Sequence, residues 1–353
     1  MVDFTRMKIS GLVVHRVGNK LKNDGIVVSK EAITNPSIEL QEVLLRYFLT
    51  SFKNEQYFKF VHSTSLDLNE IYNYTKNIFK DEASFHANSV NILKHLYESS
   101  THPNIKSGEL YVVMFEDCCV DGEMIDAIGI FKSENKDIYL KVLQNGESLG
   151  MDFEKGINTK ELDKGCIIFN IENEVGYKVA IVDKASHSEA MFWKNQFLSL
   201  AEYKDENYHT TNYINICTRF SKEIIKGEEI GDSTENMVFL SDTLDYFTNS
   251  EEFDLSTFAN DVIRKPEYIE KFIEVKAAYE KEKEIEIQDN FNISSEALKK
   301  VKKKMNNHVK LDTNVEIKIN RLQEQQFQFI EKGFDSEKGM YFYKIFYNRE
   351  KGM

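Results

Sequence analysis

The residues most suited to chemistry lie in a lysine-rich stretch that follows Ser294 and Ser295. Either serine can cap the start of a helix, and apolar residues recur behind them at helical spacing. Ammonium groups along one arc of such a helix attract phosphates, so the stretch predicts a contact with the backbone of double-stranded DNA. The expected docking face consists of Leu298, Val301 and Met305, and the expected DNA-binding residues are Lys299, Lys300, Lys302, Lys303, Lys304 and Lys310.

The same helix has two other interpretations. It can be an ordinary solvated face whose charges are compensated by neighbouring carboxylates. A helix that lies on a membrane surface needs a stronger apolar anchor than three modest side chains supply. We therefore keep the solvated face as the main alternative and expect no membrane partner.

Enzymatic chemistry has one weak signal. Glu316 and Lys318 flank one residue of an expected strand, and a metal-dependent nuclease can use such a pair with an upstream Asp312 or Asp289. The tripeptide is common by chance, and alternation puts both side chains on one face of any strand. The eight histidines are scattered, and no Walker A, G-x-S-x-G or G-x-G-x-x-G pattern occurs. We expect no enzyme, no catalytic residues, no metal and no cofactor, with the nuclease as a remote alternative.

Charge is distributed unevenly along the 353 residues, whose net charge is −13. Residues 1–183 carry 20 basic and 27 acidic side chains, residues 184–293 carry 12 and 23, and residues 294–353 carry 13 and 8. Such asymmetry indicates a basic end that faces nucleic acid. The acidic middle supports a second hypothesis, an adaptor that binds a nucleoid protein or a DNA-processing enzyme.

The four cysteines are too few for a disulfide framework in so long a chain, and no C-x-x-C spacing occurs. We expect free thiols in a reducing compartment. No apolar stretch of signal-peptide length follows Met1, and runs such as 166–169 are far too short to span a bilayer. We therefore expect a cytoplasmic protein.

Periodicity predicts the order of the elements. Strands are expected at 8–17 and 26–28, a helix after the capping residue Ser37, and helices near 69–80 and 82–98. Short turns then separate strand-like segments at 110–115, 127–131, 138–142, 166–171 and 177–182, which implies antiparallel pairing. Helical segments follow at 188–200, 210–226, 234–248, 252–262 and 266–285, with Pro266 in the first turn of the last. A short helix and strands at 314–319 and 340–347 complete the chain.

This order predicts an α+β fold. An N-terminal antiparallel sheet with helices would form one domain, residues 1–185. A largely helical domain would follow at 186–353. It would end in a small basic segment of mixed α and β structure, residues 294–353.

Several short stretches, read in order, resemble one known family. They are Val13-Val14-His15, Tyr47-Phe48, Ile128-Gly129-Ile130-Phe131-Lys132, Leu162-Asp163-Lys164-Gly165 with Ile168-Phe169-Asn170, Phe192-Trp193-Lys194 with Phe197-Leu198, Asp289-Asn290-Phe291-Asn292-Ile293-Ser294, and Val309-Lys310-Leu311-Asp312. Their order and spacing, across nearly the whole chain, are similar to the bacterial nucleoid-associated protein family of roughly 37 kDa. The resemblance implies a cytoplasmic protein of the bacterial nucleoid that binds DNA directly or through DNA-bound partners. It implies no active site.

Two hypotheses therefore remain open at this point. The first is a non-enzymatic protein whose basic C-terminal helix contacts the DNA backbone. The second is an adaptor that binds a nucleoid enzyme through its acidic helices and contacts DNA weakly or not at all. A homodimer is compatible with either hypothesis.

Overall fold

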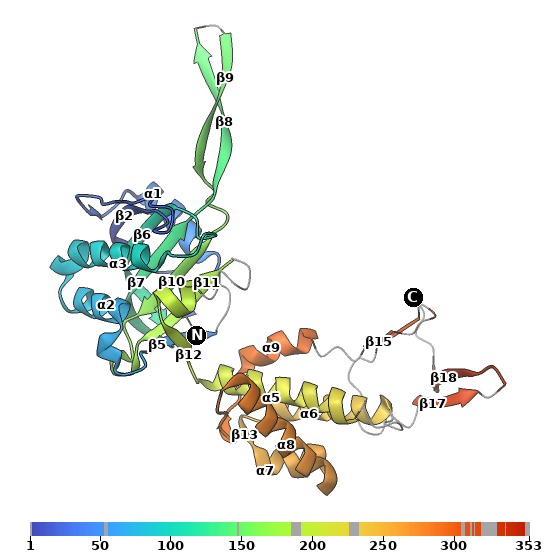
Figure 1. Ribbon diagram of the computed structural model, residues 1–353. Helices are drawn as coiled ribbons and strands as arrows, with labels where there is room; N and C mark the ends of the chain where they lie inside the picture. The colour runs from blue at the N-terminus through green and yellow to red at the C-terminus, as the bar shows by residue number, and fades with distance from the viewer. Residues whose placement is uncertain are drawn as a thin grey trace. The chain divides into compact units, whose positions relative to one another are not determined.

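The computed structural model describes residues 2–52, 56–146, 148–184, 192–225, 233–304, 308–310, 313, 315–318, 330–335 and 337–349. The chain forms two compact units, Met1–Tyr203 (unit 1) and Lys204–Met353 (unit 2) (Figure 1). The sequence placed a domain boundary near residue 185. The division lies after Tyr203 because strand β12 (Leu200–Glu202) pairs with strand β5 (Tyr57–Phe60) inside unit 1.

Unit 1 is built on a ten-stranded sheet in which every pairing is antiparallel. Its strands run in the order β12-β5-β11-β10-β7-β6-β2-β3, with β1 added to β6 and β4 added to β2. This confirms the α+β class and the antiparallel pairing. The remaining strands of this sheet are β1 (Val2–Asp3), β2 (Lys8–Val17), β3 (Ile26–Val27), β4 (Ile33–Thr34), β6 (Gly108–Val120), β7 (Glu123–Ser133), β10 (Lys164–Phe169) and β11 (Lys178–Asp183).

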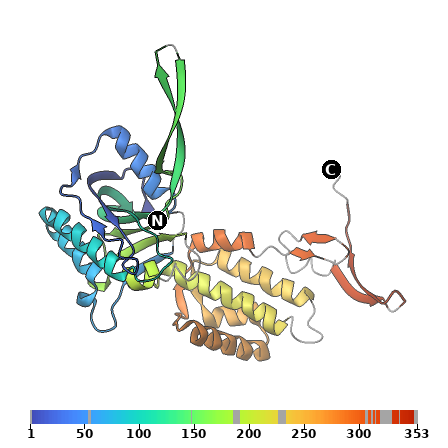
Figure 2. The ribbon, with the colours of Figure 1, turned by 45° about the horizontal axis from the view of Figure 1, so that its top comes forward.

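Alternation along the strands gives this sheet two separate cores. Val112 and Ile168 face one core, with helices α2 (Glu70–Lys80) and α3 (Phe85–Ser99), whereas Val113 and Ile167 face the other, with α1 (Ile38–Leu49). Helices α2 and α3 lie side by side (Figure 2). The expected N-cap is confirmed, since the amide of Leu40 donates to the Ser37 hydroxyl. Short helical turns join these elements at Leu66–Leu68, Glu82–Ser84, Asn173–Val175 and Phe192–Phe197.

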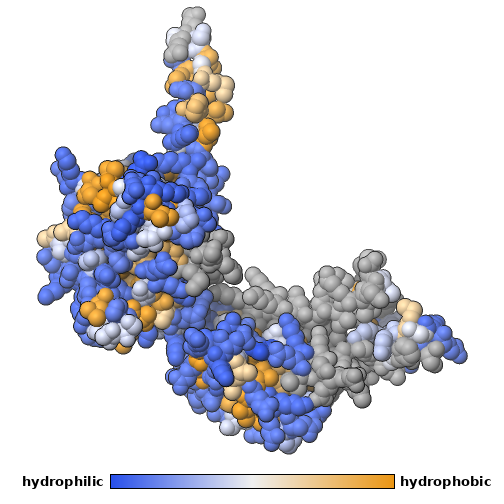
Figure 3. Space-filling view, viewed as in Figure 1, coloured by the Kyte–Doolittle hydropathy of each residue, from blue (hydrophilic) through white to orange (hydrophobic). Residues whose placement is uncertain are grey.

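One hairpin of unit 1 pairs with no strand of this sheet. Strands β8 (Lys136–Asn145) and β9 (Ser148–Ile157) form a two-stranded sheet of their own, which extends away from the body of the unit (Figure 1). Apolar side chains run along it (Figure 3). The sequence predicted part of β8 but not β9, nor β5 in the large sheet.

Unit 2 is mainly helical, and its helices pack around an aromatic core. Phe220, Phe253, Phe258, Phe272 and Phe291 are buried there. Pro266 stands in the first turn of helix α8, as the sequence predicted. The helices and turns of this unit are α5 (Glu206–Phe220), η5 (Ser221–Ile225), α6 (Ser233–Asn249), α7 (Leu255–Phe258), η6 (Ala259–Ile263), α8 (Pro266–Lys283) and α9 (Ser295–Lys304).

In the part of unit 2 that the structure describes, the strands form three small two-stranded sheets. Strand β13 (Glu252–Asp254) pairs with β14 (Asn290–Asn292) and places Phe253 against Phe291, with ring centroids 5.0 Å apart. This pairing corrects the helix expected over 252–262, whose first residues are extended. The other two sheets are β15 (His308–Lys310) with β16 (Glu316–Lys318), and β17 (Ile330–Asp335) with β18 (Met340–Ile345).

Candidate nucleic-acid interface

Helix α9 begins at a well-defined cap. The amide of Ala297 donates to the Ser294 hydroxyl at 3.3 Å, and the Ser294 amide donates to Thr210 Oγ1 of α5 at 3.0 Å. The side-chain bond satisfies one of the free amides of the first turn. The backbone bond ties the start of α9 to α5. Of the two serines that the sequence offered, Ser294 is therefore the cap.

The first turn of α9 packs into unit 2, whereas the other two expected docking residues, Val301 and Met305, lie outside the residues whose side chains the structure describes. Ala297 and Leu298 are both buried, and Leu298 belongs to the aromatic core of the unit. Lys299, one residue further, is exposed and forms no ion pair with a residue that the structure describes. The sequence anticipated Leu298 as a docking residue but overlooked Ala297.

The other lysines of the predicted site are placed only by their backbone. Lys300, Lys302, Lys303 and Lys304 occupy positions in α9 and Lys310 ends β15, and their side chains lie outside the described part of the structure. In register, Lys310 stands opposite Glu316.

The residues of the nuclease alternative do not come together as a described site. Asp312 lies outside the described residues, and Glu316 and Lys318 are placed by backbone alone. Asp289 accepts a hydrogen bond from the Tyr213 hydroxyl and pairs with Lys276 at 3.1 Å. Within the described residues, no three His, Cys, Asp or Glu side chains form a group that could hold a metal ion.

The hairpin of β17 and β18 adds a surface that the sequence did not single out. Tyr341 and Phe342 of β18, and Phe346 and Tyr347 just after it, are exposed. The exposed Lys344 lies over the Phe346 ring at 4.8 Å. Aromatic rings mixed with cations are typical of surfaces that bind nucleic acids. In the sequence, the run Tyr341-Phe342-Tyr343-Lys344 could have indicated this surface.

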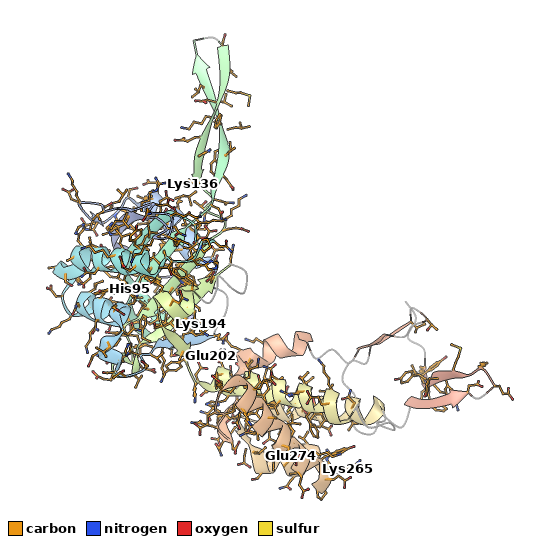
Figure 4. All side chains as sticks on the ribbon, in the orientation of Figure 1. His95, Lys136, Lys194, Glu202, Lys265 and Glu274 are labelled. Atoms are coloured by element: carbon orange, nitrogen blue, oxygen red, sulfur yellow. The ribbon has the colours of Figure 1, made fainter. Side chains whose placement is uncertain are left out.

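Helix α8 exposes several carboxylates, although its five acidic and four basic side chains give a net charge of only −1. It buries Tyr268, Phe272, Val275 and Tyr279 at helical spacing and exposes Glu267, Glu270 and Glu274. Glu274 is labelled in Figure 4. Exposed carboxylates on one helix repel DNA and can attract a basic protein.

A comparison with protein families matches residues 13–344 to the family described as nucleoid-associated protein YejK. The match covers nearly the whole chain. The chain belongs to this family. It is accordingly a nucleoid-associated protein, and the resemblance seen in the sequence is confirmed. A search of curated proteins finds no match.

Three of the stretches that resemble the family meet at one place in unit 1. Lys132 of β7 stands directly opposite Lys164 of β10, and the Trp193 indole donates to the Gly165 carbonyl at 3.3 Å. Lys132 pairs with Glu134 at 2.8 Å and Lys164 pairs with Asp183 at 2.7 Å, all four side chains being at most 10% exposed. Burial lowers the pKa of Lys132, whereas the Glu134 carboxylate opposes that shift. Both lysines are thus structural rather than available to DNA.

His15 and Cys118 are two further titratable groups that are buried in unit 1. His15 accepts a hydrogen bond from the Ser29 amide at Nδ1 and contacts the Ser89 hydroxyl through Nε2. Burial, with a smaller effect of His86, lowers the pKa of His15 to about 4. The four cysteines are free thiols, as expected, and burial raises the pKa of Cys118 to about 12. No described helix is long and apolar enough to cross a membrane.

Proposed function

We propose that this protein is a non-enzymatic component of the bacterial nucleoid in the cytoplasm that binds duplex DNA directly. The contact is made to the phosphate backbone by the lysines of α9, with the basic remainder of the C-terminal segment beside them in the sequence. The observation that carries the proposal is the way in which α9 packs on the rest of unit 2. Ser294, Ala297 and Leu298 hold the helix on unit 2, and Lys299 is left exposed without an ion pair to a described residue.

Charge supports the same assignment. Residues 294–353 have an excess of five basic side chains in a chain whose total is −13. Since screening at 0.1 M salt acts within about 10 Å, the acidic remainder repels DNA only weakly at longer range. Contacts to phosphate carry little sequence information, so unrelated duplexes should bind with similar affinity.

The adaptor remains a second candidate because of α8. Its exposed carboxylates, Glu267, Glu270 and Glu274, suit a basic protein partner better than DNA. An adaptor of this kind would bind a DNA-processing enzyme and need no DNA contact of its own. The two candidates differ in whether the purified chain binds DNA.

The test replaces Lys299, Lys300 and Lys303 by Gln. These positions lie away from the docked side of α9, and Gln keeps most of the helix propensity of Lys. If the three lysines neutralise phosphates, the slope of log K against log salt becomes shallower by about 2–3 units, because each phosphate contributes roughly −0.9. Fluorescence anisotropy of a labelled duplex, titrated between 50 and 200 mM salt, measures this slope.

The matched control replaces Lys22, Lys30 and Lys94, three exposed lysines of unit 1. It removes the same charge from the chain and should leave the slope unchanged. Equal effects of the two triple variants would mean that only net charge matters, which removes α9 from the site. A wild-type chain that binds no duplex at 50 mM salt would favour the adaptor.

A further inference from the structure

The β17–β18 hairpin carries a run of aromatic rings that the fold of unit 2 does not use. Between Met340 and Tyr347, five of the eight residues are aromatic. The two strands pair from Ile330 opposite Ile345 to Asp335 opposite Met340 (Figure 1). None of the described side chains of β18 belongs to the aromatic core of unit 2. The rings therefore have another role than stabilising that core.

Two tyrosines present the largest exposed ring surfaces of this run. Tyr341 is 74% exposed and Tyr347 is 72% exposed, whereas Phe342 is 40% exposed. The ring of Phe342 lies against Gly333 of β17, where an added Cβ would stand 2.5 Å from the Cζ atom of that ring. Phe342 is thus part of the packing of the hairpin itself. Tyr341 and Tyr347 leave most of their surface open to solvent.

Cations accompany these rings along the chain. Residues 338–349 hold three basic side chains and no acidic one, and the three acidic residues of the hairpin all lie in β17 or in the turn that follows it. Lys344 lies over the Phe346 ring at 4.8 Å. Arg349 is exposed and forms no ion pair with a residue that the structure describes. Arg349 is therefore open to an anionic ligand.

Exposed rings beside cations suit a strand of unpaired nucleotides. Every base has flat faces on which an aromatic ring can stack, and each phosphate attracts a cation. In a duplex these faces are covered by the neighbouring base pairs, so a ring gains a stacking partner only where bases are unpaired. Aromatic side chains on β-strands bind bases in this way in several folds that recognise single strands.

Other occupants match only one half of this chemistry. An acidic protein would pair with the cations but offers no flat groups to the rings. A second copy of the chain would bring its own cations against Arg349. The chain is a nucleoid-associated protein, so DNA is the polyanion that it meets. Single-stranded DNA supplies both the phosphates and the flat groups.

We propose that β18 and the residues just after it bind single-stranded DNA, with bases stacked on Tyr341 and Tyr347 and phosphate paired with Arg349. This site is separate from the duplex contact proposed for α9, because it uses other residues and recognises the bases as well as the backbone. With both sites, the chain binds DNA at places where the duplex is open.

Two oligomers of equal charge test the proposal with the full chain. One is a labelled oligo(dT) of about 15 nucleotides, and the other is an abasic deoxyribose-phosphate chain of the same length. Fluorescence anisotropy at 50 mM salt gives both affinities. The wild type should bind oligo(dT) at least about 20-fold more tightly, because each of two stacked bases contributes at least about fivefold.

A pair of variants shows whether the rings are the cause. Tyr341→Leu with Tyr347→Leu should lower the affinity for oligo(dT) to that for the abasic chain. The affinity for the abasic chain should not change, because no charge is altered. Tyr341→Phe with Tyr347→Phe is the matched control, which keeps both rings and should keep the preference for oligo(dT).

Cross-linking tests the contact without any substitution. An oligo(dT) that carries 5-iododeoxyuridine, irradiated with the wild-type chain, should label Tyr341 or Tyr347, as located by mass spectrometry. Labels confined to other parts of the chain would overturn the proposal. Equal affinity of the wild type for the two oligomers would do so as well, as would a Leu variant that keeps the preference.

The outcome is distinguishable from that for α9 and from other uses of the rings. The variant of Lys299, Lys300 and Lys303 should keep the preference for oligo(dT), even if duplex binding is lost. Leu substitutions that leave the preference intact but change the sedimentation of the chain would assign the rings to a protein contact. Substitutions that abolish only flotation with phosphatidylglycerol vesicles would assign them to a lipid surface.

Discussion

Strands β7 and β10 of unit 1 and helix α9 of unit 2 use lysine in opposite ways. In unit 1, Lys132 and Lys164 face each other across neighbouring strands, and each is buried against its own carboxylate. In unit 2, Lys299 stands on the exposed side of a helix whose other side is buried. A buried lysine must keep its partner, because a charge without one is costly in a medium of low polarity. An exposed lysine contributes little to stability and is available to a ligand. The two groups should therefore respond differently to substitution.

The largest effect is expected at Lys132. Lys132→Met removes the ammonium that pairs with Glu134 and donates to the Lys106 carbonyl. Breaking a buried pair in this way should destabilise unit 1 by about 3–5 kcal/mol, because the carboxylate remains buried without its partner. Urea unfolding followed by Trp193 fluorescence reports on unit 1.

Two further variants show whether the ion pair is the cause. Adding Glu134→Gln to Lys132→Met removes the unpaired carboxylate and should restore at least half of the loss. Lys94→Met, at an exposed position of α3, should change the free energy of unfolding by less than about 0.5 kcal/mol. If Lys132→Met is no more destabilising than Lys94→Met, the contrast between buried and exposed lysines fails.

A smaller effect concerns His15 and pH. Its folded pKa of about 4 lies below the unfolded value near 6.5, so the unfolded chain takes up the proton first. The contribution of neutral His15 to the free energy of unfolding is fully present above pH 6.5 and is lost as the pH falls from 6.5 to 4. Between pH 7.5 and pH 5 the loss from this residue should be about 2 kcal/mol. In addition, a protonated Nδ1 cannot accept from the Ser29 amide.

The measurement compares wild type with His15→Gln, because carboxylates also titrate in this range. Urea unfolding at the two pH values, again followed by Trp193, gives the pH dependence of each chain. The variant should lose about 2 kcal/mol less than the wild type on acidification. An identical pH dependence in both chains would show that His15 is not held neutral by burial.

The smallest effect is expected at the cap of α9. Ser294→Ala removes the hydroxyl that accepts from the Ala297 amide, which should cost about 1 kcal/mol of helix stability. Hydrogen exchange of the first-turn amides should become about fivefold faster. Ser295→Ala is the matched control, since Ser295 is the first residue inside the helix. Equal exchange in the two variants would mean that the cap does not order α9.

Local signals predicted much of this structure. Ser37 and Pro266 marked helix starts because capping and proline geometry depend on only a few neighbouring residues. The residues that were missed depend on distant partners. Tyr57–Phe60 is a strand because β11 and β12 flank it, and Phe253 is extended because it pairs with Phe291. Such pairings cannot be read from the spacing within one segment.

The candidate site was predictable to a similar degree. Helical spacing identified Leu298 as a docking residue, because the face of an amphipathic helix is a local property. The sequence could not separate the buried lysines from the exposed ones. Lys132 and Lys164 are buried by the strands on either side of them. Burial of that kind follows from the order of strands in the sheet rather than from nearby residues.

The central claim is that the basic end of this nucleoid-associated protein binds DNA through phosphate contacts. The most direct measurement is the affinity of the wild-type chain for a set of duplexes of unrelated sequence. Each duplex is titrated at several salt concentrations between 50 and 200 mM. With four to six phosphates neutralised, the slope of log K against log salt should be about −4 to −5 and should be the same for every duplex. Absence of binding at 50 mM salt, or binding with a slope near zero, would contradict the account.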